Sequence, residues 1–368
     1  MTDTKISSVE AIMIILTVFV AHTIVSLPQN LISNEKSAVI INLIYVGILA
    51  FILVYIIFRL IKNFSSLDII DISEYLGGKV FKNIIGGLFI AYFMISSSSL
   101  LREFCEGLRV VFFPMTNVIF VIIPFILAML INNSLSLGSN VKTISIVFPL
   151  VLFSIIFLFF ANFNHFSFEK MFPILGKGFV NTFITGIGNI TAFGGISCIY
   201  FLPPFLKEPK ELKKICLTSV IVGLLYFILC ISTILFMFSF FTEADEVLPL
   251  YSAARYIEFG IFFQRLEALF MLIWILEVCC YLIVANRFSM NIFQKITNIK
   301  YQKPLAFIFP LIIFGISLIP KNYAIIRFFE AQIYSYLILG IVFILGIGIL
   351  ILANFKKKKV GEFNGNPS

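Results

Sequence analysis

The chain has 368 residues, of which 60% are hydrophobic and only 12% are charged. A water-soluble protein of this size could not cover its surface with so few polar residues, so the composition excludes a soluble globular domain. The formal net charge of +8 comes from short clusters of Lys and Arg between apolar runs. They form no basic face with interleaved aromatic residues, so we expect a membrane protein without a nucleic-acid partner.

Apolar runs that could cross a bilayer recur along the whole chain. About 20 helical residues span the hydrocarbon core. On that scale, crossings are expected near residues 8–30, 37–61, 83–113, 116–133, 141–161, 183–205, 214–241, 257–290, 304–320 and 327–354. The fold class expected is therefore an all-α polytopic membrane protein with about ten transmembrane helices, in a single domain over residues 1–355.

The distribution of basic residues predicts the orientation, because cytoplasmic loops carry an excess of Lys and Arg. If the N-terminus is cytoplasmic, the inner segments carry 18 basic residues and the outer segments carry seven. Both termini are therefore expected to face the cytoplasm. Residues 356–368 begin with a run of lysines and continue as a polar, glycine-containing stretch, which predicts a basic and then disordered cytoplasmic tail.

Two of the expected spans look interrupted. In the first, small, polar and β-branched residues follow Ala21 and end at Pro28; in the sixth, glycines and polar residues crowd around Gly194. These are corresponding positions in two halves of five spans, residues 8–161 and 183–354, which predicts a 5+5 inverted repeat with broken helices 1 and 6.

Unwound helices in a bilayer survive where they line a cavity, and their free backbone groups can hold both the carboxylate and the ammonium of an amino acid. The sequence therefore predicts a ligand site formed by the two interruptions. Its expected residues are Thr23, Ile24, Val25, Ser26, Ala192, Phe193, Gly194 and Gly195. The alternative is that the glycines are sites of close helix packing.

Several charged residues lie inside the expected spans, where each needs a structural or functional reason. In the third span, Arg102, Glu106 and Arg109 are spaced four and three apart, so they can pair on one helical face or border a ligand. The eighth span begins with Arg265 and Glu267 and carries Glu277 about midway. Glu277 predicts either a proton- or cation-linked role or a pair with another helix.

Two further observations bear on chemistry. His22 adjoins the first interruption, where it could be a structural donor or a proton relay. The chain has no phosphate-binding loop, nucleophile elbow or HExxH motif, and its cysteines have no CxxC spacing. We therefore expect neither an enzyme nor a cofactor, and no metal site.

Two segments resemble a known family. Leu101-Arg102-Glu103-Phe104, with Phe113-Pro114-Met115-Thr116-Asn117, resembles the junction between the third and fourth spans of the spore-germination permeases. Phe263-Gln264-Arg265-Leu266-Glu267, followed by Phe270 and Trp274, is similar to that family's Arg-x-Glu-x-x-Phe-x-x-x-Trp signature in the eighth span. The ten spans, the prolines and the length agree with it over nearly the whole chain.

Members of this family are B subunits of nutrient germinant receptors, within the amino acid–polyamine–organocation superfamily. The resemblance implies a LeuT-type fold in the inner membrane of a bacterial spore. It also implies that a small nutrient, expected to be an amino acid, binds in the core, with A and C subunits as partners. A proton- or cation-coupled amino acid transporter is the alternative. Where family members often carry a glutamate after the sixth-span glycine, this chain has Ile196, which leaves the contact to an amino group unassigned.

Overall fold

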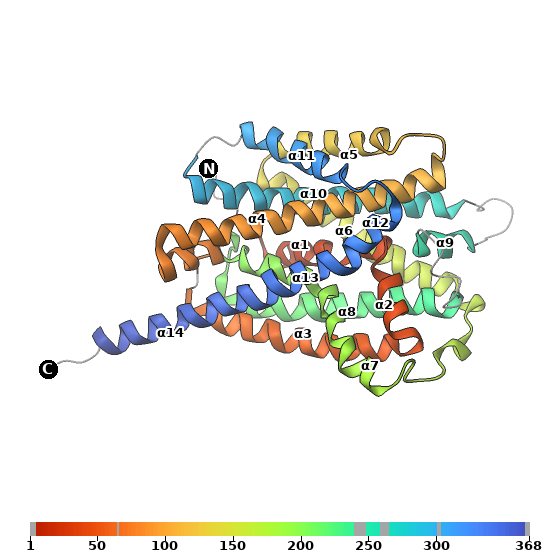
Figure 1. Cartoon of the computed structure of the whole chain (residues 1–368), viewed down its shortest axis with the longest axis horizontal. Coiled ribbons are helices and arrows are strands. Elements are labelled where there is room, and N and C mark those ends of the chain that lie inside the picture. Colours follow the sequence, from red (N-terminus) through yellow and green to blue (C-terminus); the bar gives the residue numbers. More distant parts are fainter. Residues whose placement is uncertain (1–4, 65, 239–247, 258–264, 300–302, 365–368) are drawn as a thin grey trace.

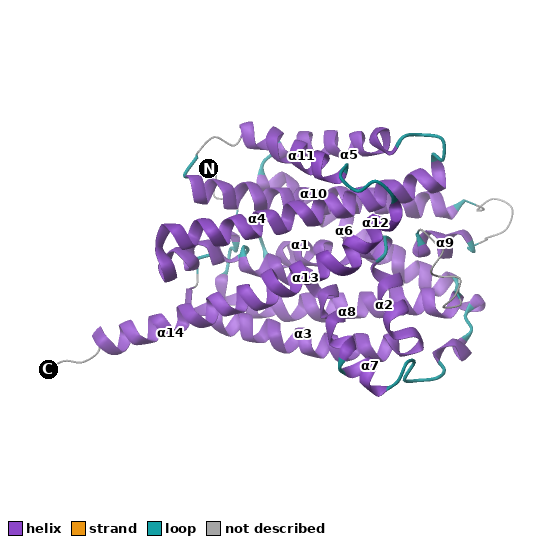
Figure 2. Ribbon diagram, viewed as in Figure 1, coloured by secondary structure: helices purple, strands orange, loops and turns teal. Residues whose placement is uncertain are grey.

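The computed structural model describes residues 5–64, 66–238, 248–257, 265–299 and 303–364. Within these residues the secondary structure is helical, apart from one isolated parallel bridge between Ile6 and Leu206. Figures 1 and 2 show the long helices lying side by side along the longest axis of the molecule. The predicted all-α class is confirmed.

The chain is divided among helices of very different length. The N-terminal part forms α1 (Ser8–Val20), α2 (Leu27–Glu35), α3 (Val39–Ile61), α4 (Ile69–Phe112), α5 (Val118–Asn133) and α6 (Leu137–Ala161). The C-terminal part forms α7 (Phe179–Phe183), α8 (Leu212–Met237), α9 (Pro249–Arg255), α10 (Leu266–Thr297), α11 (Lys303–Ser317), α12 (Tyr323–Phe328), α13 (Ser335–Leu337) and α14 (Gly346–Asn364). The 3₁₀ segment η6 (Thr185–Tyr200) follows α7, and the π-type segments η9 (Phe329–Tyr334) and η10 (Ile338–Leu345) flank α13.

Among the described residues, seven helical segments are long and apolar enough to cross a membrane. Three further apolar helices are shorter, at Ser8–Ile24, Val118–Asn133 and Pro304–Ser317. The length and composition of the seven are those of a bundle built for a bilayer. Ten crossings and the division into five and five stay predictions.

The helix α4 differs from its expected form. The hydropathy pattern places a span at 83–113, whereas α4 begins at Ile69 and bends at Gly78, whose φ of +72° is accessible to glycine. Asp68 caps its start by accepting hydrogen bonds from the N–H groups of Ile70 and Asp71. Beyond the bend, α4 packs along α10, in the same way as α3 packs along α8.

The first predicted interruption is present. α1 ends at Val20, a 3₁₀ turn covers Ala21–Ile24, and Val25 leaves helical geometry with φ −104° and ψ −143° before α2 begins. Pro28 stands in the first turn of α2, where it has no N–H to continue the hydrogen bonding of a preceding turn. The sequence therefore stops one helix and starts another inside the same apolar run.

The second interruption is longer than the glycine pattern indicates. All of Thr185–Tyr200 is 3₁₀ rather than α-helical, and Phe193, one residue before Gly194, has non-helical angles of φ −89° and ψ 27°. A tighter helix leaves backbone groups to be satisfied from outside. Asn42 of α3 does so by donating to the carbonyls of Thr182 and Gly186, at 2.7 and 3.0 Å.

Buried amides and one carboxylate join α2, α3, α7 and η6. The Asn189 amide donates to Glu35 Oε1 and to Asn42 Oδ1, at 3.1 and 2.8 Å. Asn181 donates to Glu35 Oε2 at 3.3 Å, and Asn34 donates to Asn189 Oδ1 at 3.2 Å. A buried polar network whose members are satisfied holds its elements in one arrangement. The network therefore joins α2 and α3, which follow the first interruption, to α7 and the first part of η6.

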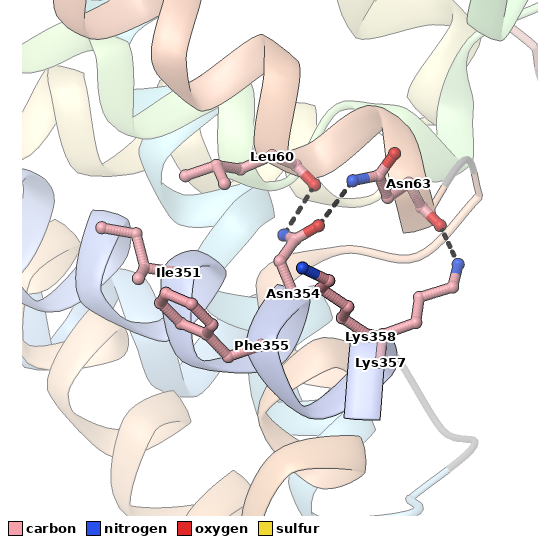
Figure 3. Close-up of a pocket in the computed structure, with 7 residues that line it drawn as sticks. All are labelled: Leu60, Asn63, Ile351, Asn354, Phe355, Lys357 and Lys358. Carbon is pink, nitrogen blue, oxygen red and sulfur yellow. Dashed lines mark hydrogen bonds between the residues drawn. The ribbon is translucent and has the colours of Figure 1, made fainter. Parts of the chain in front are cut away.

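The last helix is attached to the end of α3 (Figure 3). Asn354 donates to the carbonyl of Leu60 at 3.0 Å and accepts from Asn63 at 2.5 Å, while Lys357 donates to the carbonyl of Asn63. The helix continues through Asn364, whereas the sequence predicts disorder after the lysines. Lysine is a good helix former, so the apolar helix that precedes the lysine run can extend through it. Residues 365–368 lie outside the described part.

Candidate functional site

A cavity of about 660 Å³ lies where α2, η6, η9 and α13 meet. Its lining combines amide, hydroxyl, imidazole and carboxylate groups with aliphatic side chains. The lining residues are His22, Leu27, Asn30, Leu31, Ser33, Asn34, Thr185, Gly188, Asn189, Thr191, Glu330, Ala331, Gln332, Tyr334, Ser335, Tyr336, Ile338 and Leu339. Ligand sites are typically concave and apolar with a few converging polar groups, and this space, here called the central cavity, has that character.

His22 occupies the inner wall of the central cavity. Its ring stacks on Tyr334 with centroids 4.8 Å apart, and Nε2 lies 3.5 Å from the hydroxyl of Tyr281. On the other side of the ring, Nδ1 lies 3.5 Å from Oε2 of Glu330, within ion-pair distance. The first interruption therefore places an imidazole between a tyrosine of α10 and a carboxylate of η9.

Hydroxyl groups from α4 and α10 continue this polar cluster below His22. Tyr281 is hydrogen-bonded to Ser96, and Tyr92 donates to the carbonyl of Gly194 at 3.3 Å. Tyr92 also stacks on Tyr334, with ring centroids 6.4 Å apart. These contacts connect both interruptions to the long helices α4 and α10.

Glu330, next to His22, and Glu103, near Glu330, are buried carboxyl groups without a complete set of partners. Oε1 of Glu330 has no hydrogen-bond partner among the described residues, and neither do the two oxygens of Glu103. Glu103 faces Ser26 and lies close enough to Glu330 for the charges to repel, while Arg327 attracts it. Buried polar groups are normally satisfied, and Glu330 also lines the central cavity, so its free oxygen is a candidate contact for a ligand.

The eight residues predicted to bind ligand are all buried or nearly so, but none lines the central cavity. Thr23 donates to the carbonyl of Val20 at 2.6 Å and contacts Tyr226, while Ile24, Val25 and Ser26 are inside the bundle. In the second interruption, Gly188, Asn189 and Thr191 line the cavity in place of Ala192–Gly195. Ligand contact at the predicted residues stays a prediction.

The residues after Thr191 pack against α1 instead. The ring of Phe193 meets those of Phe19 and Phe227 edge to face, with centroids 5.6 and 5.3 Å away. A Cβ at Gly195 would lie 2.5 Å from Cδ1 of Phe19, and one at Gly194 would lie 2.9 Å from Cδ1 of Ile338. Such close approach is typical of helix packing, which was the alternative left open for these glycines.

The charged residues predicted in the spans have three different environments. Glu106 pairs with Arg109 at 2.7 Å and approaches Arg102 at 4.0 Å, so the predicted ion-paired face of α4 is present. Arg265 is exposed at the start of α10, and Glu267 lies in its first turn. Glu277 is fully buried and faces Thr17 of α1, yet no hydrogen bond of its carboxylate to a described residue is found.

Sequence reasoning missed Glu330, Tyr334 and Asn189. Glu330 lies near the start of the last apolar run, where an acidic residue resembles an ordinary membrane-surface charge. A signal was available in the rarity of acidic residues within these runs. In the described part, no group of three or more His, Cys, Asp or Glu side chains that could hold a metal ion is found.

Long apolar helices, two of them interrupted where a polar cavity forms, define a permease-type integral membrane protein. The sequence model of the family described as "Spore germination protein" matches residues 5–325. The chain belongs to this family.

Curated relatives come from Bacillus subtilis (strain 168). Spore germination protein YndE is 22% identical over 360 residues, which covers 96% of this chain and 98% of that protein. Spore germination protein A2 is 22% identical over 331 residues, covering 87% and 88% of the two chains. Spore germination protein B2 is 20% identical over 281 residues, covering 74% of each. The likeness therefore extends over most of the molecule.

Solved structures with a similar fold include transporters. A nucleobase-cation-symport-1 family transporter, MHP1, in a closed conformation with bromovinylhydantoin bound, has a TM-score of 0.60 at 14% identity, covering 92% of this chain and 75% of that one. A manganese transporter mutant from Eremococcus coleocola has a TM-score of 0.55 at 12% identity, covering 98% and 89%. At these identities the likeness concerns the fold alone.

Proposed function

We propose that this chain is the membrane subunit of a spore nutrient germinant receptor and that it binds a small nutrient, an amino acid in the first instance, in the central cavity. The observation that carries the proposal is the central cavity itself, placed at the two interruptions and walled by partly unsatisfied polar groups. Membership of the spore germination protein family supports the biological setting.

The proposal includes the location and the partners. The protein resides in the inner membrane of the spore with both termini facing the cytoplasm, as the distribution of basic residues indicates. Residues 8–161 and 183–354 are the two inverted repeats, and germinant receptor A and C subunits assemble with the chain. Ligand binding shifts the arrangement of the bundle, and the partners detect that shift.

The central cavity can be filled at Gly188. A Cβ built there meets no heavy atom within 4 Å, and Gly188 lines the cavity. We expect Gly188→Trp to abolish the germination response to nutrient while the protein still accumulates in the spore membrane. Gly87→Trp is a matched control, because Gly87 is exposed on α4 and equally uncrowded. A normal dose–response in Gly188→Trp spores with normal protein levels would contradict the proposal.

A proton- or cation-coupled amino acid transporter is the second candidate, favoured by Glu277, a fully buried carboxyl group that faces Thr17 of α1 inside the bundle. Uptake of labelled amino acids by proteoliposomes that contain only this chain separates the two functions. The receptor proposal predicts binding without concentrative uptake under an imposed proton or sodium gradient. Concentrative uptake in the absence of partner subunits would favour the transporter.

A further inference from the structure

The lining of the central cavity carries a negative side chain and no Lys or Arg among the described residues. Glu330 contributes that charge, with its side chain 5% exposed and Oε1 without a hydrogen-bond partner. A carboxylate removed from water is unfavourable unless a cation and hydrogen-bond donors compensate it. The described residues of the wall supply this compensation only in part.

The groups facing Glu330 explain why its compensation is incomplete. His22 approaches Oε2, but Nδ1 has no hydrogen bond of ordinary geometry. Glu103 is a second buried carboxyl group, whose charge when ionised would repel that of Glu330. The hydroxyls of Tyr92, Tyr281 and Tyr334 also lie near enough to be affected by the charge of Glu330. Arg327 is a positive group in this neighbourhood, and its charge acts on Glu103.

A protonated amine is the group that would complete this site. An ammonium supplies a positive charge and three donors, enough for Oε1 of Glu330 and for neighbouring hydroxyl or carbonyl oxygens. Asn34, elsewhere on the cavity wall, donates one side-chain N–H to Asn189 and has a second one for the carboxylate or uncharged part of the same molecule.

We propose that Glu330 binds the protonated amine of the ligand, so that the central cavity takes amines and amino acids in preference to anions and uncharged sugars. The inference rests on the proposed function, because it assumes that the ligand occupies the central cavity. It assigns a contact for the amino group, which Ile196 cannot provide. It also places that contact on the last span, outside the two interrupted segments.

The charge of the cavity can be measured without knowing the nutrient. In Gly188→Cys protein, we expect the cationic reagent 2-aminoethyl methanethiosulfonate to react faster than the anionic 2-sulfonatoethyl methanethiosulfonate. Glu330→Gln should lower the ratio of the two rates by a factor on the order of three or more, as expected for loss of one charge at low effective dielectric. Glu330→Asp and Gln332→Asn change no charge and should preserve the ratio. Protein without the Gly188→Cys substitution measures the background reaction of the native cysteines. A ratio that Glu330→Gln leaves unchanged would overturn the proposal.

Amine recognition is tested by protection of the same cysteine. Among the 20 common amino acids, the one that slows modification most is compared with its 2-hydroxy-acid analogue, which replaces the ammonium by a hydroxyl. We expect at least tenfold weaker protection by the analogue, and loss of this difference in Glu330→Gln. Equal protection by both compounds, or protection by none of the amino acids, contradicts the amine assignment. A loss of the nutrient response in Gly188→Trp spores would still stand, so the two proposals can fail separately.

Discussion

The two interrupted segments have opposite characters on either side of their breaks. On one side, α2 and residues 185–191 form a polar wall around the central cavity, joined by Asn189 and Glu35. On the other side, α1 and residues 193–200 pack through aromatic rings, with Phe19 against Phe193 and with Gly195 in contact with α1. In each of the two segments, one half lines the central cavity and the other half is tightly packed. The packed region formed by Phe19, Phe193, Gly195 and Phe227 is here called the seal.

Further hydrogen bonds and ion pairs hold the packed side together. Ile6, just before α1, accepts from the N–H of Lys207 at 2.9 Å and donates to the carbonyl of Phe205 at 2.8 Å. Lys295 of α10 binds both Asp68 and Asp71 at 2.6 and 2.5 Å, tying α10 to the start of α4. A receptor needs access only from the cavity side, whereas a transporter must also open the packed side.

The largest loss of stability is expected from removing the ring of Phe19, the central residue of the seal. Phe19 is 1% exposed and contacts Phe193 and Phe227. Phe19→Ala should destabilise the protein by about 3–5 kcal/mol, the usual cost of truncating a buried Phe. Thermal unfolding in detergent measures it. Phe120→Ala is the control, because Phe120 is 67% exposed and should change little. Equal melting temperatures for the two variants would contradict the seal.

A smaller loss of stability is expected from adding a methyl group at Gly195, within the seal. Gly195→Ala should cost about 1–3 kcal/mol, because the added methyl group meets the Phe19 ring and backbone. Gly188→Ala faces open space and should be neutral or slightly stabilising. The Phe19→Ala background removes the ring, so the cost of Gly195→Ala should fall there in a double-mutant cycle. Strict additivity of the two changes would show that the glycine does not pack on Phe19.

The smallest effect concerns the first turn of α1. Ser7 and Glu10 form a capping box in which Glu10 Oε2 accepts from the Ser7 N–H at 2.6 Å and from its hydroxyl at 2.8 Å. Ser7→Ala should cost about 1 kcal/mol and speed hydrogen exchange in this turn. Ser7→Asn, which keeps a capping side chain, should behave like the unmodified protein. Unchanged exchange in Ser7→Ala would mean that contacts such as the Ile6 bridge hold this end.

Hydropathy predicted the helical class, and Pro28 and the glycines predicted where two helices stop, because breaks follow from local backbone chemistry. Which side of a break lines a cavity depends on partners far away in the sequence. Gly195 and Gly188 look alike in sequence, but only the position of Phe19 makes one a packing site. The approach of His22 to Glu330 likewise depends on the arrangement of the whole bundle.

Direct binding to the purified chain tests the central claim of a ligand in the central cavity. The nutrient that triggers germination of the native spores is radiolabelled, and equilibrium binding is compared in nanodiscs for the unmodified chain, Gly188→Trp and Gly87→Trp. The account predicts saturable binding to the unmodified chain and to Gly87→Trp, with at least a tenfold loss of affinity in folded Gly188→Trp. Unaltered binding to Gly188→Trp would contradict it.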